Sequence, residues 1–105
     1  MQDLCFSYNW NNKLDCRAFT TLRLTDKYNV GEKVNIIFKN KPMGTGTVVG
    51  KKSFPIDKIT DFIGYIDTGY CAEETRKILM RMYKNKNINW ITQPVFFYLI
   101  LKDKN

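Results

Sequence analysis

The stretch that decides the fold is CRAFTTLR at positions 16–23, followed by YNVGEKV at positions 28–34. The first indicates a basic turn that enters an extended segment, and the second is a turn centred on Gly31 that opens another strand. Residues two apart on a strand point to the same face, so Thr21 and Arg23 should project together. An unpaired guanidinium is costly to bury, which predicts that Arg23 lines a polar cleft or meets a carboxylate.

The rest of the chain predicts strands and helices around this segment. We expect strands at 3–8, 19–24, 33–39, 44–50 and 95–102, helices at 9–15 and 72–84, and a short helical turn capped by Thr60. A turn is expected at 40–43. The glycines of 44–50 indicate a bulge, bend or close approach, as in a sheet that curls into a barrel. The apolar run at 95–102 predicts a strand buried on both faces. This order of elements is typical of an α+β protein with a mostly antiparallel sheet.

Length and composition place further bounds on the chain. Its 105 residues, 44% of them hydrophobic and 14% aromatic, predict one packed globular domain spanning 1–105. The longest apolar run has only strand length, and no secretory leader is visible, so we expect no membrane partner. The three cysteines form no Cys-x-x-Cys pair and there is no histidine. We therefore expect neither a disulfide framework nor a metal site, no cofactor, and a cytoplasmic location.

The net charge of +7 favours a polyanionic partner, most often nucleic acid. The alternative is a lysine-rich surface that only aids solubility. A single surface lysine or arginine is usually just solvated, but two groups of them stand out. The first is near Phe54 and contains Lys39, Lys41, Lys51, Lys52 and Lys58; the second is on the second helix and its loop and contains Arg76, Lys77, Arg81, Lys84 and Lys86. Such groups beside aromatics are typical of a groove that follows a nucleic-acid backbone. Tyr8, Trp10 and Trp90 are candidates either for core and rim positions or for base stacking.

The order of elements and the residues at 16–34 resemble the ASCH domain, a branch of the PUA-like β-barrel superfamily. The ASCH signature G-x-K-x-x-T-x-R is matched at its last two positions by Thr21 and Arg23. The following turn, y-x-v-G-[DE]-x-v, is matched by YNVGEKV at 28–34. The resemblance covers almost the whole chain and implies a small, mixed, mostly antiparallel PUA-like barrel flanked by two or three helices.

This chain departs from the signature at two positions. Cys16 stands at the glycine and Ala18 at the lysine. Some small bacterial ASCH proteins are amidohydrolases of N4-acylated cytidine that use the signature lysine and threonine with a glutamate. Ala18 carries no amine, and Arg17 beside it stays protonated, so the resemblance implies a weakened enzymatic function. Thr21, with Asp67 or Glu74, remains the catalytic candidate.

The leading hypothesis is therefore a monomeric module that binds RNA, another nucleic acid or a nucleotide. The expected contacts are Arg17, Thr21, Arg23, Lys39, Lys41, Lys51, Lys52, Arg76 and Arg81. For Arg23 the alternative is an internal ion pair with Asp67 or Glu74, for Thr21 an ordinary strand position, and for Asp67 a plain helix cap. Two other functions stay open: a small amidohydrolase, and a protein-interaction module such as a phage-encoded modulator of a bacterial host factor.

Overall fold

The computed structural model describes residues 1–103 and contains five strands and four helical segments. The strands are β1 (Gln2–Phe6), β2 (Ala18–Arg23), β3 (Lys33–Phe38), β4 (Lys41–Pro55) and β5 (Pro94–Lys102). The helical segments are η1 (Trp10–Asp15) and η2 (Ile56–Lys58), both 3-10, and the α-helices α1 (Asp61–Asp67) and α2 (Ala72–Met82). These elements confirm the expected α+β class. Among the described residues no helix is both long enough and apolar enough to cross a bilayer.

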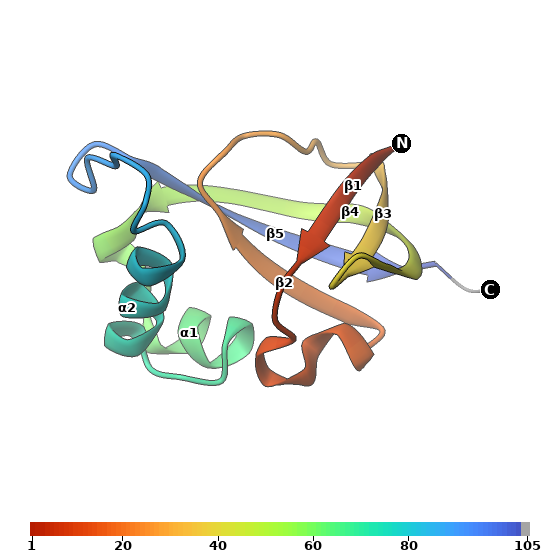
Figure 1. The fold of residues 1–105 in the computed structure, drawn as a ribbon, viewed down its shortest axis with the longest axis horizontal. Helices are drawn as coiled ribbons and strands as arrows, with labels where there is room; N and C mark the ends of the chain where they lie inside the picture. Colours follow the sequence, from red (N-terminus) through yellow and green to blue (C-terminus); the bar gives the residue numbers. More distant parts are fainter. Residues whose placement is uncertain (104–105) are drawn as a thin grey trace.

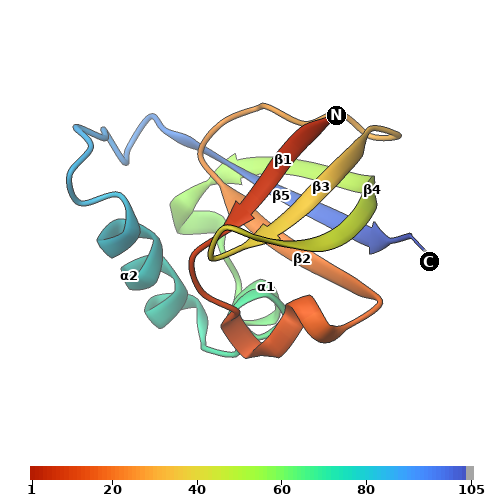
Figure 2. The ribbon, with the colours of Figure 1, turned by 45° about the vertical axis from the view of Figure 1, so that its right-hand side comes forward.

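The strands form one curled sheet in the order β1-β3-β4-β5-β2. β1 pairs with β3 in parallel, and the other three pairings are antiparallel. The curl brings the end of β1 over β2, as Figures 1 and 2 show, but no backbone ladder within residues 1–103 joins β1 to β2. The expected barrel is thus barrel-like with an open seam between its two edge strands.

Strand β4 bends the sheet where its glycines lie. The pairing of β4 with β5 shifts register between Val48 and Gly50, which is the bulge expected of a glycine-rich strand. A Cβ on Gly46 would lie 2.9 Å from Cγ2 of Ile100, so the two strands approach closely there. The strand begins before the predicted 44–50 because its connection to β3 is shorter than the expected 40–43 turn, and it continues to Pro55 because residues 51–55 also pair with β5. Lys39 and Asn40, both with positive φ, form a two-residue hairpin turn.

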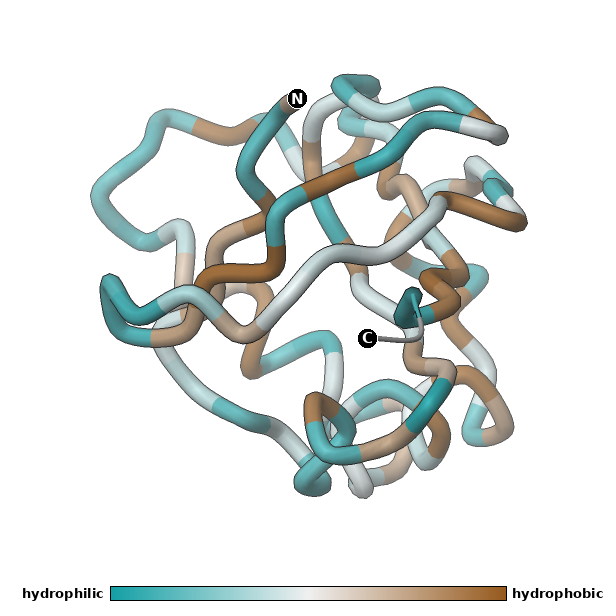
Figure 3. Tube along the Cα trace, turned by 90° about the vertical axis from the view of Figure 1, so that its right-hand side faces the viewer, coloured by the Kyte–Doolittle hydropathy of each residue, from teal (hydrophilic) through white to brown (hydrophobic). Residues whose placement is uncertain are grey.

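The core consists of two apolar clusters on opposite faces of β5. Tyr98 and Ile100 pack inside the curl, whereas Val95 and Phe97 pack with Leu79 beneath α2. The prediction that this strand is buried on both faces is correct only for its first half. Leu99 and Leu101 are exposed, because α2 covers just one end of the sheet (Figure 1). In Figure 3 the apolar stretches follow the strands and helices, while hydrophilic residues gather at the turns.

The structure corrects two predicted boundaries and the type of one predicted helix. β1 ends at Phe6 rather than at position 8, and α2 ends at Met82 rather than at position 84. The segment expected as a helix at 9–15 is two 3-10 turns, since Asn11 and Asn12 adopt left-handed φ values of 57° and 51°. Asparagine tolerates that conformation better than most residues. The predicted cap of α1 is confirmed, because Thr60 Oγ1 accepts a hydrogen bond from the Ile63 amide.

Helices α1 and α2 approach each other at Gly64, which brings the end of α1 to the sheet. A Cβ at this position would lie 2.5 Å from the carbonyl oxygen of Tyr70 and 2.8 Å from Oγ1 of Thr75. We therefore expect Gly64→Ala to lower the free energy of unfolding by about 1–3 kcal/mol through overpacking. Urea denaturation measures the loss. Gly50→Ala is the control, since its nearest neighbour is a side-chain atom of Leu99 at 3.3 Å; an equal effect of both changes would contradict the expectation.

Candidate functional site

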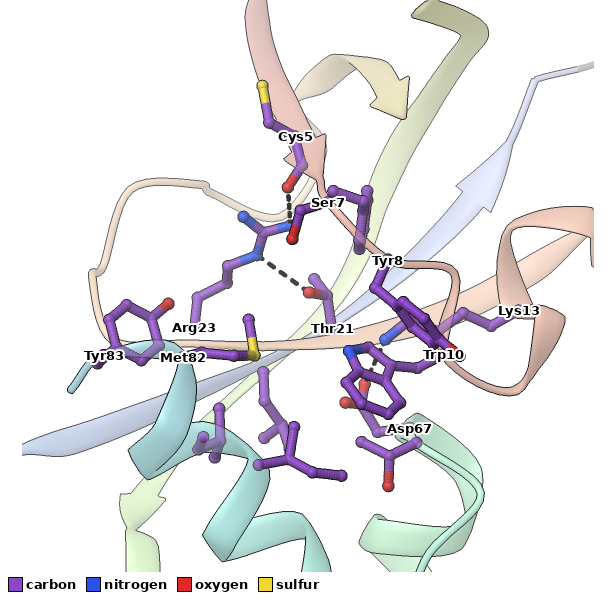
Figure 4. A pocket seen from close by; sticks show the side chains of 15 residues that line it. Cys5, Ser7, Tyr8, Trp10, Lys13, Thr21, Arg23, Asp67, Met82 and Tyr83 are labelled. Carbon is purple, nitrogen blue, oxygen red and sulfur yellow. Dashed lines mark hydrogen bonds and ion pairs between the residues drawn. The ribbon is translucent and has the colours of Figure 1, made fainter. Parts of the chain in front are cut away.

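A pocket of about 80 Å³ opens at the seam between β1 and β2. The end of β1 contributes Phe6. β2 contributes Thr21 and Arg23 (Figure 4). Asp67 at the end of α1 and Met82 at the end of α2 close the opposite side. At about 10–15 Å³ for each water-sized group, the pocket has room for roughly six such groups. That is room for a small planar ring.

Arg23 crosses the seam. Its Nε donates to Oγ1 of Thr21 at 3.0 Å, and one terminal nitrogen donates to the carbonyl oxygen of Cys5 at 2.8 Å. The prediction that Thr21 and Arg23 project together is thereby confirmed. The alternative prediction, an ion pair from Arg23 to Asp67 or Glu74, is wrong: these carboxylates pair with lysines instead. A guanidinium carries five N–H donors, so Arg23 keeps donors for a ligand.

Aromatic rings form the walls of the pocket. The guanidinium carbon of Arg23 lies 4.8 Å from the ring centroid of Phe6, a cation–π contact that holds both side chains in place. Tyr8 and Trp10 lie on the rim with ring centroids 4.4 Å apart, and Tyr83 follows Met82 on the facing wall. Flat apolar faces beside fixed hydrogen-bond donors are the usual composition of a small-ligand site.

The floor of the pocket contains a buried ion pair that the sequence did not predict. Nζ of Lys13 lies 3.0 Å from Oδ1 of Asp67, and the two side chains are 6% and 5% exposed. The hydroxyl of Thr20 donates to the same carboxylate oxygen at 2.9 Å. Asp67 is therefore the partner of Lys13 rather than a plain helix cap. Because Lys13 and Asp67 offset each other, the uncompensated charge of this pocket is the cation of Arg23.

Lys13 is missing from the expected site because its burial depends on a carboxylate 54 residues away. Its own neighbourhood predicts a solvent-exposed helical lysine. The left-handed turns at Asn11 and Asn12 direct it inward instead. The neighbouring Leu14, which the helical spacing places on the same face as Trp10, is fully buried. It is the one local sign that this segment packs against the sheet.

Burial lowers the pKa of Lys13 below its ordinary value of 10.5, and Asp67 opposes part of that shift. The unfolded chain thus binds more protons than the folded chain between the lowered pKa and 10.5, so stability should rise with pH across that window. Urea denaturation of the protein and of Lys13→Met at several alkaline pH values measures the slope. We expect the slope to be smaller in Lys13→Met, and equal slopes would contradict the assignment.

Three of the expected contacts, before β2 and at the β3–β4 hairpin, lie outside the pocket lining. Arg17 lies six residues from Arg23, about 20 Å along an extended strand, and its Nε donates to the carbonyl oxygen of Lys102. It does not line the pocket. Lys39 lies in the β3–β4 turn and Lys41 begins β4, and the Lys39 amide donates to the carbonyl oxygen of Phe6 at 3.0 Å. That hairpin is therefore next to the pocket wall.

The predicted cluster of lysines around one hairpin is not found. Ten residue steps of β4, about 33 Å of strand, separate Lys41 from Lys51. Lys51 forms an ion pair with Asp26, which raises its pKa, and Lys52 is exposed on the same part of β4.

The second basic group is also divided. Arg76 donates to the carbonyl oxygen of Ile59 at 3.1 Å, so it links α2 to the segment before α1. Lys77 pairs with Glu73 and Glu74, and Glu74 does not line the pocket. Arg81 is exposed at the end of α2, next to Met82 on the pocket wall. Within residues 1–103 no three cysteine or carboxylate side chains gather as a metal site.

Comparison with known proteins supports the fold only. No protein-family model matches the chain, and no curated protein sequence matches it. The fold is similar to that of the crystal structure of protein EF3133 from Enterococcus faecalis V583, described as family DUF984. The two structures superpose with a TM-score of 0.74 over 98% of this chain and 76% of that one, at 11% sequence identity.

Proposed function

We propose that this protein is an ASCH-type, PUA-like module that binds single-stranded nucleic acid, preferably RNA, with one unstacked base or nucleotide in the pocket at Arg23. The observation that carries the proposal is the guanidinium of Arg23, fixed at a seam between aromatic walls and left without a carboxylate partner. Proteins that read single-stranded RNA stack splayed bases on aromatic or guanidinium planes and bond to the base edges. The matches of Thr21 and Arg23 to the ASCH signature agree with this position of the site.

The surroundings of the pocket supply contacts for phosphates. Lys39 and Lys41 lie on the hairpin beside Phe6, and Arg81 lies on the opposite rim at the end of α2. Exposed cations on both sides of a small opening suit a chain that passes over it, and the net charge of +7 favours a polyanion. Arg17, Lys51 and Lys52 do not line this opening and are assigned no contact here.

Fluorescence polarisation with a labelled, mixed-sequence single-stranded RNA of about 10 nucleotides tests the proposal. We expect saturable binding at low salt and an affinity that falls steeply as salt rises, since phosphate contacts release counterions. DNA of the same sequence separates RNA from nucleic acid in general. Absence of binding to either at low salt would refute the proposal.

A second candidate function, hydrolysis of an N4-acylated cytidine, is favoured by Lys13. The amine that Ala18 cannot supply is present on the pocket floor beside Asp67, and that carboxylate also accepts a hydrogen bond from Thr20, the neighbour of Thr21 on β2. Lys13, whose pKa is lowered by burial, accepts the proton of the attacking Thr21 hydroxyl and returns it to the nitrogen as the amide C–N bond breaks and the amine leaves. Water then hydrolyses the acyl-Thr21 ester to the carboxylic acid and regenerates the hydroxyl. Incubation with N4-acetylcytidine tests it: we expect turnover that Thr21→Ala and Lys13→Met abolish, and no turnover by the parent protein rejects it.

A further inference from the structure

A second hollow lies directly beside the pocket. It is a polar groove of about 320 Å³, bordered by the end of β1, the two 3-10 turns of η1 and the α1–α2 connection. Tyr8, Trp10 and Thr68 line both hollows, so the pocket and the groove share one wall. The second groove is open to solvent along that wall. The two hollows are therefore neighbours on either side of this wall.

The shared wall continues as a row of aromatic rings. The centroids of Tyr8 and Trp10 are 4.4 Å apart, and the centroid of Tyr70 lies 6.2 Å beyond that of Trp10, with its ring nearly perpendicular. Tyr8 is 56% exposed and Tyr70 is 50% exposed. Because these two rings are about half exposed, a flat ligand such as a base can stack on them.

Polar groups fix the other side of the groove. Nδ2 of Asn11 donates to the carbonyl oxygen of Tyr65, and Oδ1 of Asn9 accepts from the Leu14 amide. Gly69 has a φ of 85°, and a Cβ there would lie 3.2 Å from the Asn11 side chain. The side chains of Asn9 and Asn11 are thus held by hydrogen bonds, and Asn12 also lines the groove. Amides facing aromatic rings suit a heterocycle that carries both a flat face and polar edges.

We propose that this groove, defined by Asn12, Trp10 and Tyr70, is a second nucleotide subsite that receives the base adjacent to the one in the Arg23 pocket. The inference rests on the proposed function and deepens it, because it makes the ligand a chain of at least two nucleotides rather than a free nucleoside. Stacking on a ring accepts any base, so the subsite adds affinity with little sequence preference.

The fluorescence of Trp10 reports ligand binding at the shared wall. The chain has two tryptophans, and Trp90 packs against the core beneath α2, so Trp90→Phe leaves Trp10 as the sole tryptophan on the shared wall. Quenching of its fluorescence is titrated with cytidine 5′-monophosphate, a trinucleotide RNA and a trinucleotide DNA. We expect the RNA trinucleotide to bind more tightly than the monophosphate. In this background Tyr70→Ala should weaken trinucleotide binding about tenfold and leave the monophosphate unchanged.

Tyr65→Ala is the matched control, because Tyr65 is a 55% exposed tyrosine that lines neither hollow. Tyr70→Leu keeps apolar bulk but removes the ring, and it should weaken trinucleotide binding like Tyr70→Ala; thermal unfolding verifies that each variant is folded. If Tyr70→Ala changes the affinity for neither ligand, or for both equally, the second subsite is refuted while the proposed function stands. If neither ligand quenches Trp10 at low salt, both proposals fail together.

Discussion

Arg23→Ala should weaken binding of single-stranded RNA by about 10- to 100-fold. The guanidinium lies at the centre of the pocket with donors left for a ligand, and a hydrogen bond to a charged group contributes about 1.5–3 kcal/mol. Part of the loss arises from the seam itself, because the cation–π contact with Phe6 and the bond to the Cys5 carbonyl disappear too. Polarisation titration at fixed low salt measures the change.

Arg17→Ala is the matched control for this result. Arg23 ends β2 and Arg17 directly precedes it, and the guanidinium of each arginine donates to a main-chain oxygen. Only Arg23 lines the pocket. We expect less than about a threefold effect for Arg17→Ala, since a screened rim charge contributes little to affinity. Equal losses from the two variants would assign binding to overall charge and would contradict a specific role for the pocket.

Asp67→Ala should lower the free energy of unfolding by about 3–5 kcal/mol, the largest stability effect we expect in this chain. Its removal leaves the buried ammonium of Lys13 and the hydroxyl of Thr20 without their carboxylate. Chemical denaturation near neutral pH measures the loss. The double variant Lys13→Met/Asp67→Leu should regain most of it, because apolar groups of similar size replace a buried pair at little cost.

An exposed ion pair provides the comparison for Asp67. Asp26 pairs with Lys51 at the surface and is 56% exposed, so Asp26→Ala should cost less than about 1 kcal/mol. If Asp67→Ala also costs less than about 1 kcal/mol, the Lys13–Asp67 pair is not the buried interaction described here.

Much of the fold follows from local pattern. The two-residue spacing of Thr21 and Arg23 places both side chains at the pocket, and the glycines of β4 mark the bulge and close approach that curl the sheet. These features depend on strand alternation and on backbone freedom, and both are properties of short segments. The same logic explains why the cap at Thr60 was predicted correctly.

The parts that sequence could not predict depend on contacts between distant segments. Lys13 is buried only because Asp67 lies across from it, and the seam is open because β1 and β2 end as edges of the sheet. The separation of Lys41 from Lys51 follows from the length of β4, which no local signal determines. Lysines that are close in the sequence therefore predict the composition of a surface, but they do not predict where on that surface each lysine lies.

The most direct test of the central claim is an amide NMR titration of the uniformly ¹⁵N-labelled protein with a mixed-sequence single-stranded RNA hexamer at low salt. We expect the largest shift changes at positions 5–10, 21–23 and 67–70, together with the Nε–H signal of Arg23. Changes confined to Arg17, Lys51 and Lys52, or no changes at all, would contradict recognition at the seam.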